Sequence, residues 1–449
     1  MTRLLPPLLL PCLLLAQTTF QRTYGGADPD YGYSLVQTAD GGYVIVGQTH
    51  SFGAGATDAY LVKTNASGDT MWTRTFGGSD YDEGSSVAQT ADGGYIIAGN
   101  TQSFGAGDRD VWVIKTDGNG DSLWTRTLGG AGDEYGLAVG CTVDSGHIVA
   151  GYTNSFGAGG YDIWLIRTDA SGDTLWTRTY GDTLWEFGRS VQETVDRGFI
   201  IAGYTYSLRT SDCNLHLVRT DSQGDTMWTR SYGGPSGDRA YSVLQTSDGG
   251  FITAGYTVSF GAGYDDVWLI KTDASGDTSW TRTYGGSDGD GGLSLSKTTD
   301  SGYVIAGYAR SFGAGGKDLW LIKTDSAGVS EWARTFGGEG GEQGHSVQQT
   351  ADGGYVIAGY TSSFGAGSYD IWLIKTDSAG QVAIAETPEP EQAETMKPSL
   401  MTRAQLLAEL LHDPALFLYD ASGGRILNPE SGVLFLRTAT STRKVIIAD

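Results

Sequence analysis

The motif SFGAG occurs six times in this chain of 449 residues, and successive copies lie 52 residues or twice 52 residues apart. The repeat extends beyond the motif, since seven units of 52 residues cover positions 20–383 without an insertion. Each unit opens on an aromatic residue: Phe20, Trp72, Trp124, Trp176, Trp228, Trp280 and Trp332. Such a repeat indicates an array of similar structural units, and it overrides the estimate of about three domains that length alone would give.

Each unit contains four short β-rich runs bounded by clusters of glycine, aspartate and serine. In the second unit they are WTRTF, SSVAQT, GYIIAGNT and DVWVIKTD, and no unit shows helical periodicity. Four strands in a repeat of this length predict a propeller blade. A solenoid is the alternative, but its terminal repeats would need polar caps, whereas the first and last units match the middle ones. We therefore predict an all-β fold with a seven-bladed β-propeller over residues 18–383.

The two ends of such a ring must be joined by a closing strand. Because the outer strand of each blade opens the next unit, the seventh blade lacks one. We expect TTFQRTYGG (residues 18–26) to pair with DIWLIKTD (370–377), and the competing segment is QVAIAE (381–386). An open edge strand is an aggregation liability, so one of the two segments should cover it.

Glycine and aspartate at the turns of the repeat account for much of the amino-acid composition. TADGGY connects the first two strands and TDASGDTLW forms the last hairpin, where aspartate can bond its own backbone and glycine can take a positive φ. Much of the net charge of −23 is therefore turn chemistry. This acidic balance still disfavours nucleic acid as a partner, because the phosphate backbone would be repelled. The repeat arginines are expected to stack on aromatic residues of the adjacent strand, such as Trp112 and Trp164.

Both ends of the chain differ from the repeats. Residues 1–16 carry one arginine before a leucine-rich stretch, which indicates a signal peptide and is too short to span a membrane. An acidic, proline-containing linker is predicted at 384–399. Beyond it, LMTRAQLLAELLHD has helical spacing, while ALFLYDASGGRI, SGVLFLRTAT and TRKVIIAD have the composition of strands. We therefore predict a small C-terminal α+β domain at 400–449.

The motifs YGGSD, DGGYIIAG, DIWLIKTD and TDASGDTLW resemble the bacterial seven-bladed β-propeller (SBBP) repeat family, over all seven units. The resemblance implies a secreted or cell-surface propeller and no defined enzymatic activity. LYDASGGRILNPESGVLFLR, together with TRKVIIAD, resembles the terminal strands of the type IX secretion sorting domain. That resemblance implies export through this secretion machinery, and the alternative is a small accessory domain.

The sequence offers no recognisable catalytic or cofactor site. The five histidines occupy unrelated repeat positions, and no phosphate-binding loop stands between a strand and a helix. Cys141 and Cys213 also lie at different repeat positions and are interpreted as isolated thiols. We therefore predict no enzyme, no catalytic residue and no cofactor. A glycan-active enzyme of sialidase-like architecture is the alternative, and it would require an acid, a base and arginines in one pocket.

An acidic residue stands ten positions after each opening aromatic residue. These acids are Asp30, Asp82, Glu134, Glu186, Asp238, Asp290 and Glu342. The link from outer to inner strand should bring them towards the axis, where a ring of carboxylates would bind a cation such as calcium or a polar ligand. The alternative is that each acid caps a turn.

The fourth unit departs from the repeat at two places that we expect on one rim of the propeller. SLRTSDCN (207–214) replaces the SFGAG turn, and GDTLWEFG (181–188) brings Trp185 beside Glu186. Neutral drift is the alternative explanation. A tryptophan and Arg209 gathered on one rim are typical of a contact site, so we predict that Trp185, Glu186 and Arg209 bind a protein or glycan partner. The predicted function is a non-catalytic exported or cell-surface module for binding or structure.

Overall fold

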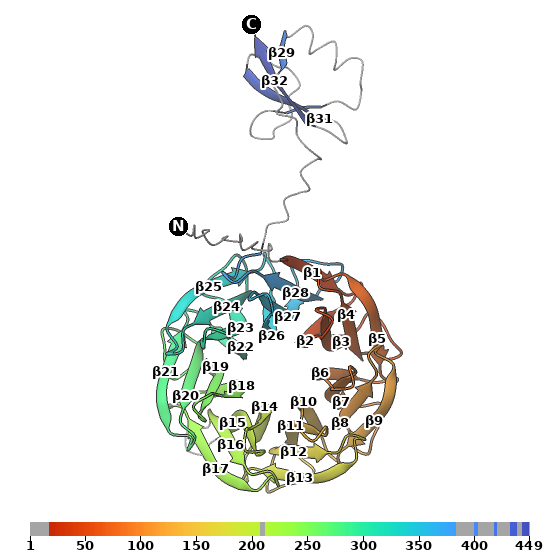
Figure 1. Cartoon of the computed structure of the whole chain (residues 1–449), viewed down its shortest axis with the longest axis vertical. Helices are drawn as coiled ribbons and strands as arrows, with labels where there is room; N and C mark the ends of the chain where they lie inside the picture. Colours follow the sequence, from red (N-terminus) through yellow and green to blue (C-terminus); the bar gives the residue numbers. More distant parts are fainter. Residues whose placement is uncertain are drawn as a thin grey trace, which may run out of the picture. The chain divides into compact units, whose positions relative to one another are not determined.

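The computed structural model describes residues 18–206 and 212–382, together with four strands nearer the C-terminus. The chain divides into two compact units, Met1–Ala383 and Ile384–Asp449. In the first unit, seven four-stranded sheets are arranged around a central axis, which confirms the seven-bladed propeller (Figure 1). All strand pairs within a blade are antiparallel, as in the first blade, where β2 pairs with β3 and β4 with β5.

In blades one to six the strands run from the axis outwards in chain order. Blade one contains β2 (Asp30–Gln37), β3 (Tyr43–Thr49), β4 (Asp58–Thr64) and β5 (Thr70–Phe76). Blade two contains β6 (Asp82–Gln89), β7 (Tyr95–Thr101), β8 (Asp110–Thr116) and β9 (Ser122–Leu128). Blade three contains β10 (Glu134–Cys141), β11 (His147–Thr153), β12 (Asp162–Thr168) and β13 (Thr174–Tyr180). Blade four contains β14 (Glu186–Glu193), β15 (Phe199–Tyr206), β16 (Cys213–Thr220) and β17 (Thr226–Tyr232). Blades five and six are β18 (Asp238–Gln245), β19 (Phe251–Thr257), β20 (Asp266–Thr272), β21 (Thr278–Tyr284); and β22 (Asp290–Lys297), β23 (Tyr303–Ala309), β24 (Asp318–Thr324), β25 (Ser330–Phe336).

Blade seven is completed by the beginning of the chain. Its inner strands are β26 (Glu342–Gln349), β27 (Tyr355–Thr361) and β28 (Asp370–Thr376), and its outer strand is β1 (Phe20–Tyr24). Strand β1 pairs antiparallel with β28, so that Phe20 lies opposite Lys375 and Tyr24 opposite Ile371. The predicted closure by residues 18–26 is therefore confirmed, and Gln381 and Val382 of the competing segment lie outside any strand.

Apolar packing between neighbouring blades forms the core. The two middle strands of each blade are buried along most of their length, because both faces of a blade contact another blade. Between blades one and two, for example, Val46 and Leu61 pack against Ile97 and Ile114. Seven such clusters surround the axis and leave the axis itself to the inner strands.

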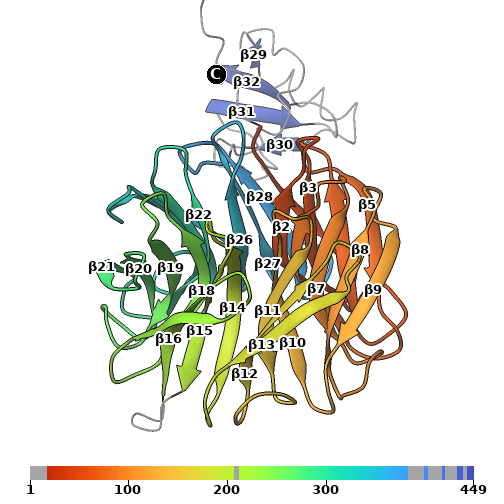
Figure 2. The ribbon, with the colours of Figure 1, turned by 60° about the horizontal axis from the view of Figure 1, so that its bottom comes forward.

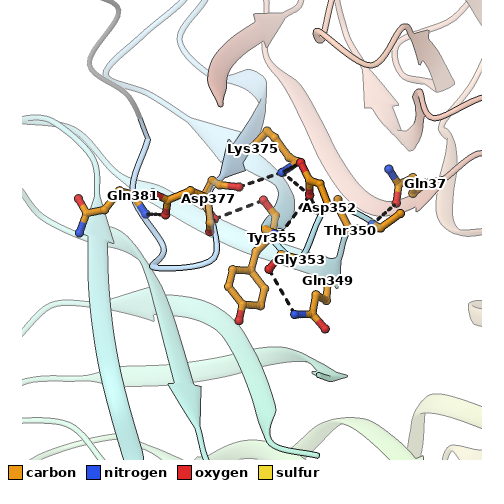
Figure 3. Close-up of polar contacts among 12 residues, drawn as sticks. Gln37, Gln349, Thr350, Asp352, Gly353, Tyr355, Lys375, Asp377 and Gln381 are labelled. Carbon is orange, nitrogen blue, oxygen red and sulfur yellow. Dashed lines mark hydrogen bonds and ion pairs between the residues drawn. The ribbon is translucent and has the colours of Figure 1, made fainter. Parts of the chain in front are cut away.

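The two ends of the propeller carry different loops, and Figure 2 shows the strands running between them. One end, here called the acid-bearing rim, holds the SFGAG turns and the starts of the inner strands. The other end holds the aspartate-glycine turns. There the buried Lys375 reaches Asp352 at 3.0 Å, and Gly353 has a φ of +84° (Figure 3). The Asp352 carboxylate also accepts the Gly354 N–H at 3.1 Å, as the turn interpretation predicts.

The repeat arginines stack differently from the prediction. Arg126 lies over Trp124 of its own strand, 5.3 Å from the ring centroid, and not over an aromatic residue of the adjacent strand. The two residues are two positions apart on the outer strand, so both side chains point to the same face. From there Arg126 reaches Asp173 in the last hairpin of the next blade at 3.2 Å. This pattern links the outer edges of successive blades.

The second unit contains one sheet in the order β29-β32-β31-β30. Its strands are β29 (Ser399–Thr402), β30 (Phe417–Tyr419), β31 (Gly432–Arg437) and β32 (Thr442–Ala448). Three of them lie within the predicted strand segments. The predicted α+β character is not supported, since the described residues contain no helix and the expected helix at 400–413 begins within β29.

Several predicted segments lie outside the described residues. They are the signal peptide at 1–16, nearly all of the linker at 384–399, the helical segment from 403 and the turn at 207–211. Among the described residues, no helix is long and apolar enough to cross a membrane.

Candidate functional site

The seven units provide an internal comparison that shows where the propeller is not uniform. The fourth residue of each inner strand faces the axis, and the seven units place five different residue types there: Tyr33, Ser85, Leu137, Arg189, Tyr241, Leu293 and His345. Two residues later in the same inner strand, all seven units carry valine or leucine. Divergence at one position among otherwise similar units indicates that this position is not fixed by the fold.

These seven residues, with Glu83, line one central cavity of about 300 Å³. The seven variable residues come from seven different blades, because the fourth positions of all the inner strands meet at the axis. Glu83 lies on the same strand as Ser85. The Glu83 carboxylate accepts hydrogen bonds from the Tyr81 hydroxyl at 2.6 Å and from the Asn100 amide. Burial lowers the pKa of His345 to about 4, so its imidazole is neutral at pH 7. We did not expect this cavity from the sequence, although the variation at intervals of 52 residues was a signal for it.

Aromatic side chains gather on the acid-bearing rim at blades three and four. This aromatic arc consists of Tyr135, Tyr152, Tyr161, Trp185, Phe187, Tyr204 and Tyr206. Strand register explains much of it, since Tyr135 lies opposite Tyr152 and Phe187 lies opposite Tyr204. Ring centroids in these two pairs are 4.5 and 4.8 Å apart. Phe187 also meets Tyr152 edge-on at 4.7 Å, which joins the two blades.

Trp185, one of the predicted contact residues, is the exposed member of the aromatic arc. Half of its surface is accessible, and its ring lies 6.2 Å from Tyr161 and 5.7 Å from Tyr206. A tryptophan that remains this exposed within an aromatic cluster is suited to bury apolar area against a partner. The arc contains six aromatic residues that the prediction had not named.

The two other predicted contact residues have different outcomes. Glu186 is buried beside Trp185, and its carboxylate accepts hydrogen bonds from the Thr205 hydroxyl at 2.7 Å and the Asp182 N–H at 3.0 Å. Burial is the main reason that the pKa of Glu186 is raised. Arg209 lies outside the described residues, and a role for either residue in ligand binding stays a prediction.

The seven predicted ring acids all begin an inner strand and are all buried. In blade two, the Asp82 carboxylate accepts hydrogen bonds from the Gly78 N–H at 2.7 Å, from the Ser103 hydroxyl at 2.6 Å and from the Thr101 hydroxyl. Such contacts tie the link from outer to inner strand to the SFGAG turn, and they favour the capping alternative. Among the described residues, no group of three or more acids, histidines or cysteines is placed to hold a metal ion. Cation binding by the ring therefore stays a prediction.

A second set of aspartates explains the SFGAG motif. In blade two, the Asp110 carboxylate accepts the N–H groups of Ala106 at 2.9 Å and Gly107 at 3.1 Å, which closes the turn. Gly105 has a φ of +110°, a conformation that favours glycine. Blade four carries Asn214 at the position of Asp110, and it is also the blade without SFGAG. The turn and its supporting aspartate have thus changed together.

Comparisons with known proteins assign no family to this chain. No protein-family profile matches this chain. The regulatory protein FlaEY of Caulobacter vibrioides is 26% identical over 192 residues, which cover 36% of this chain and 20% of that protein. The chain thus spans about a fifth of the length of this relative.

Solved structures with a similar course of the chain share little sequence with it. A protein of unknown function from Bacteroides caccae is 12% identical, with 65% of this chain and 93% of that chain covered and a TM-score of 0.41. Sqt1 from Chaetomium thermophilum is 11% identical, with 76% and 83% covered and a TM-score of 0.43. YCF48 bound to D1 peptide is 11% identical, with 80% and 96% covered and a TM-score of 0.45. The strand pairing of the chain itself therefore carries the fold assignment.

Proposed function

We propose that the propeller is a binding module that engages its partner with the aromatic arc on the acid-bearing rim. The observation that carries this proposal is Trp185, which is half exposed and surrounded by aromatic rings in the blade that departs from the repeat. Ordering this residue costs little, because neighbouring rings already restrict it. A half-exposed tryptophan packed among other aromatic rings is a feature of interaction sites.

The partner that fits this surface best is a polypeptide. Tryptophan, tyrosine and arginine are the residue types that contribute most at protein interfaces, and the arc supplies the first two. Arg189 and Arg239 lie directly beside it, within 6 Å of the Tyr204 ring. A glycan remains the alternative partner, and the same experiment distinguishes the two.

A random-peptide display library and a glycan array, both probed with the full chain, test the proposal. We expect selected peptides to bind at least tenfold more weakly to Trp185→Ala and Tyr161→Ala variants. Leu123→Ala is the matched control, because Leu123 is 58% exposed on the outer strand β9 and away from the arc. The control should leave the affinity unchanged.

Two outcomes would overturn this proposal. If peptides bind both arc variants as tightly as the wild-type protein, the arc is not the contact surface. If only glycans bind, and their retention depends on Trp185, the partner is a carbohydrate and not a polypeptide.

A glycan-active enzyme of sialidase-like architecture is the second candidate. Its support is the central cavity, which brings together Glu83, Arg189 and His345. Against it stand the single arginine among the residues that line this cavity and the engagement of Glu83 by Tyr81 and Asn100. Release of fluorophore from a fluorogenic sialoside, lost in Glu83→Gln, would favour the enzyme.

We also propose that the protein is exported to the cell surface or beyond. Support comes from the leucine-rich residues 1–16 and from the resemblances to SBBP repeats and to a type IX sorting domain. Fractionation of cells that express an epitope-tagged chain tests this, with a variant that lacks residues 400–449 as the comparison. Accumulation of the full chain inside the cell would contradict it.

A further inference from the structure

Five cationic residues stand at variable repeat positions near the acid-bearing rim. They are Arg109, Arg189, Arg239, Arg310 and Lys317. None of them forms an ion pair with a carboxylate among the described residues. By contrast, repeat cations such as Lys271 are paired, in this case with Asp248 at 2.8 Å. In a chain with a net charge of −23, cations without carboxylate partners on one rim are unexpected.

Two of these cations share one tyrosine ring. The guanidinium groups of Arg189 and Arg239 lie 5.7 and 4.8 Å from the centroid of Tyr204. Arg189 also lies 5.6 Å from the Tyr241 centroid and donates a hydrogen bond to the Tyr204 hydroxyl at 3.3 Å. Aromatic faces stabilise both cations, and Arg239 also donates a hydrogen bond to Cys213 Sγ at 3.2 Å. Two like charges held close together attract an anion.

Arg189 lines the central cavity and retains hydrogen-bonding capacity. Its Nε is buried and has no partner among the described residues, and the same is true of Nε2 of His345 on another blade. A buried polar group without a partner is costly, and such groups usually bind something. Leu137 and Leu293 add apolar surface to the same cavity. The cavity wall therefore combines a cation, two residues that carry unpartnered nitrogen atoms, and an apolar surface.

We propose that the central cavity binds a small organic carboxylate, with its carboxylate on Arg189 and its apolar body against Leu137 and Leu293. A planar guanidinium matches a carboxylate in geometry and charge. The volume of about 300 Å³ lies at the lower end of the range for small-molecule sites. Tyr81 and Asn100 donate hydrogen bonds to the Glu83 carboxylate, which forms no ion pair with Arg189. The site adjoins the aromatic arc, since Arg189 donates a hydrogen bond to Tyr204, but its ligand differs from the partner proposed there.

Isothermal titration calorimetry of the full chain with benzoate tests the proposal, with benzamide as the uncharged probe of similar shape. We expect saturable binding of benzoate at millimolar concentration and no saturable binding of benzamide. Arg189→Gln should weaken benzoate binding at least tenfold. Leu293→Trp should do the same by filling the cavity from a different blade, which guards against a folding defect in one variant.

Arg310→Gln is the matched control, because it removes a charge from the same rim without altering the cavity lining. Neither this variant nor Trp185→Ala should change the affinity for benzoate. No saturable benzoate binding, equal binding of benzamide, or unchanged affinity in Arg189→Gln would overturn the proposal. Equal affinity for inorganic phosphate would show that the site selects charge alone and would overturn the assignment to an organic carboxylate.

Discussion

At the scale of single residues, three turns adopt a conformation that their sequence does not favour. Ser145, Arg197 and Ser301 have φ values of 68°, 71° and 69° at the turn position where other blades carry glycine. A side chain in this left-handed region costs about 1–2 kcal/mol relative to glycine. The repeat predicted the turn in every blade, because aspartate and glycine mark it. It gave no sign that three blades keep the same geometry without glycine.

We expect Ser301→Gly to raise the free energy of unfolding by up to about 1 kcal/mol, because relief of the strained φ exceeds the extra entropy of glycine in the unfolded chain. Denaturation by guanidinium chloride measures the change. Gly353→Ser, at the equivalent turn of blade seven, is the control and should be destabilising by a similar amount. A loss of stability in Ser301→Gly would show that the serine side chain contributes contacts that outweigh the strain.

At the scale of elements, the turns and strand ends contain carboxylates of two opposite kinds. Hydrogen bonds from Lys271, which has the larger effect, and from Thr246 lower the pKa of Asp248 to about 2. Burial, in contrast, raises the pKa values of Asp266 and Asp370 at the starts of third strands. The sequence predicted that the aspartate of the TADGGY turn bonds its own backbone, but not that a buried lysine pairs with it. It did not predict the second kind, since only side-chain packing shows that these carboxylates are buried against the SFGAG turn.

These shifts act on stability together with three histidines, His147, His216 and His345, whose pKa values burial lowers to about 4. As the pH falls from about 7 to 4, the unfolded state takes up protons at these histidines first, so they make stability decrease. Over the lower part of this range the folded state takes up protons at Asp266 and Asp370 before the unfolded state does, so these two carboxyl groups partly offset the decrease. Below about pH 4, the Asp248 carboxylate binds a proton in the unfolded state before it does so in the folded state, so stability decreases until about pH 2. Unfolding midpoints between pH 2 and pH 7 test this.

Two variants separate the two limbs of this pH profile. Asp266→Asn, which introduces the residue type that blade four carries at Asn214, should steepen the decrease in stability between pH 7 and pH 4, because it removes one of the offsetting carboxyl groups. Asp248→Asn should reduce the loss on the acidic side. Equal pH profiles of Asp266→Asn and the wild-type protein would contradict the assignment of the buried carboxylates.

At the scale of the whole molecule, the period of 52 residues was sufficient to predict the number of blades, their strands and the closure of the ring. Strand boundaries were less accurate, since the inner strand β6 begins at Asp82 and not at Ser85. The central cavity was missed because its residues are 52 positions apart and share no chemistry. Trp185 was singled out because it interrupts the repeat, whereas its aromatic neighbours are spread over several strands and meet only in the folded propeller.

Deletion of residues 18–26 should lower the thermal midpoint markedly, because it removes β1 and leaves β28 as an open edge. It also removes Phe20 and Tyr24 from the core cluster between blades seven and one. Differential scanning calorimetry measures the effect, and a chain that ends at residue 382 is the control. An unchanged midpoint after the deletion would show that closure by β1 does not stabilise the ring.

The most direct test of the account compares the wild-type protein with a variant whose fourth unit is rewritten to the repeat. Positions 181–188 and 207–214 would take the residues of the second unit, which removes Trp185 and restores the SFGAG turn and its aspartate. The dissociation constant of a peptide selected on the wild-type chain is measured for both. We expect at least tenfold weaker binding to the rewritten variant. Equal affinity would show that the irregular blade is not the contact surface.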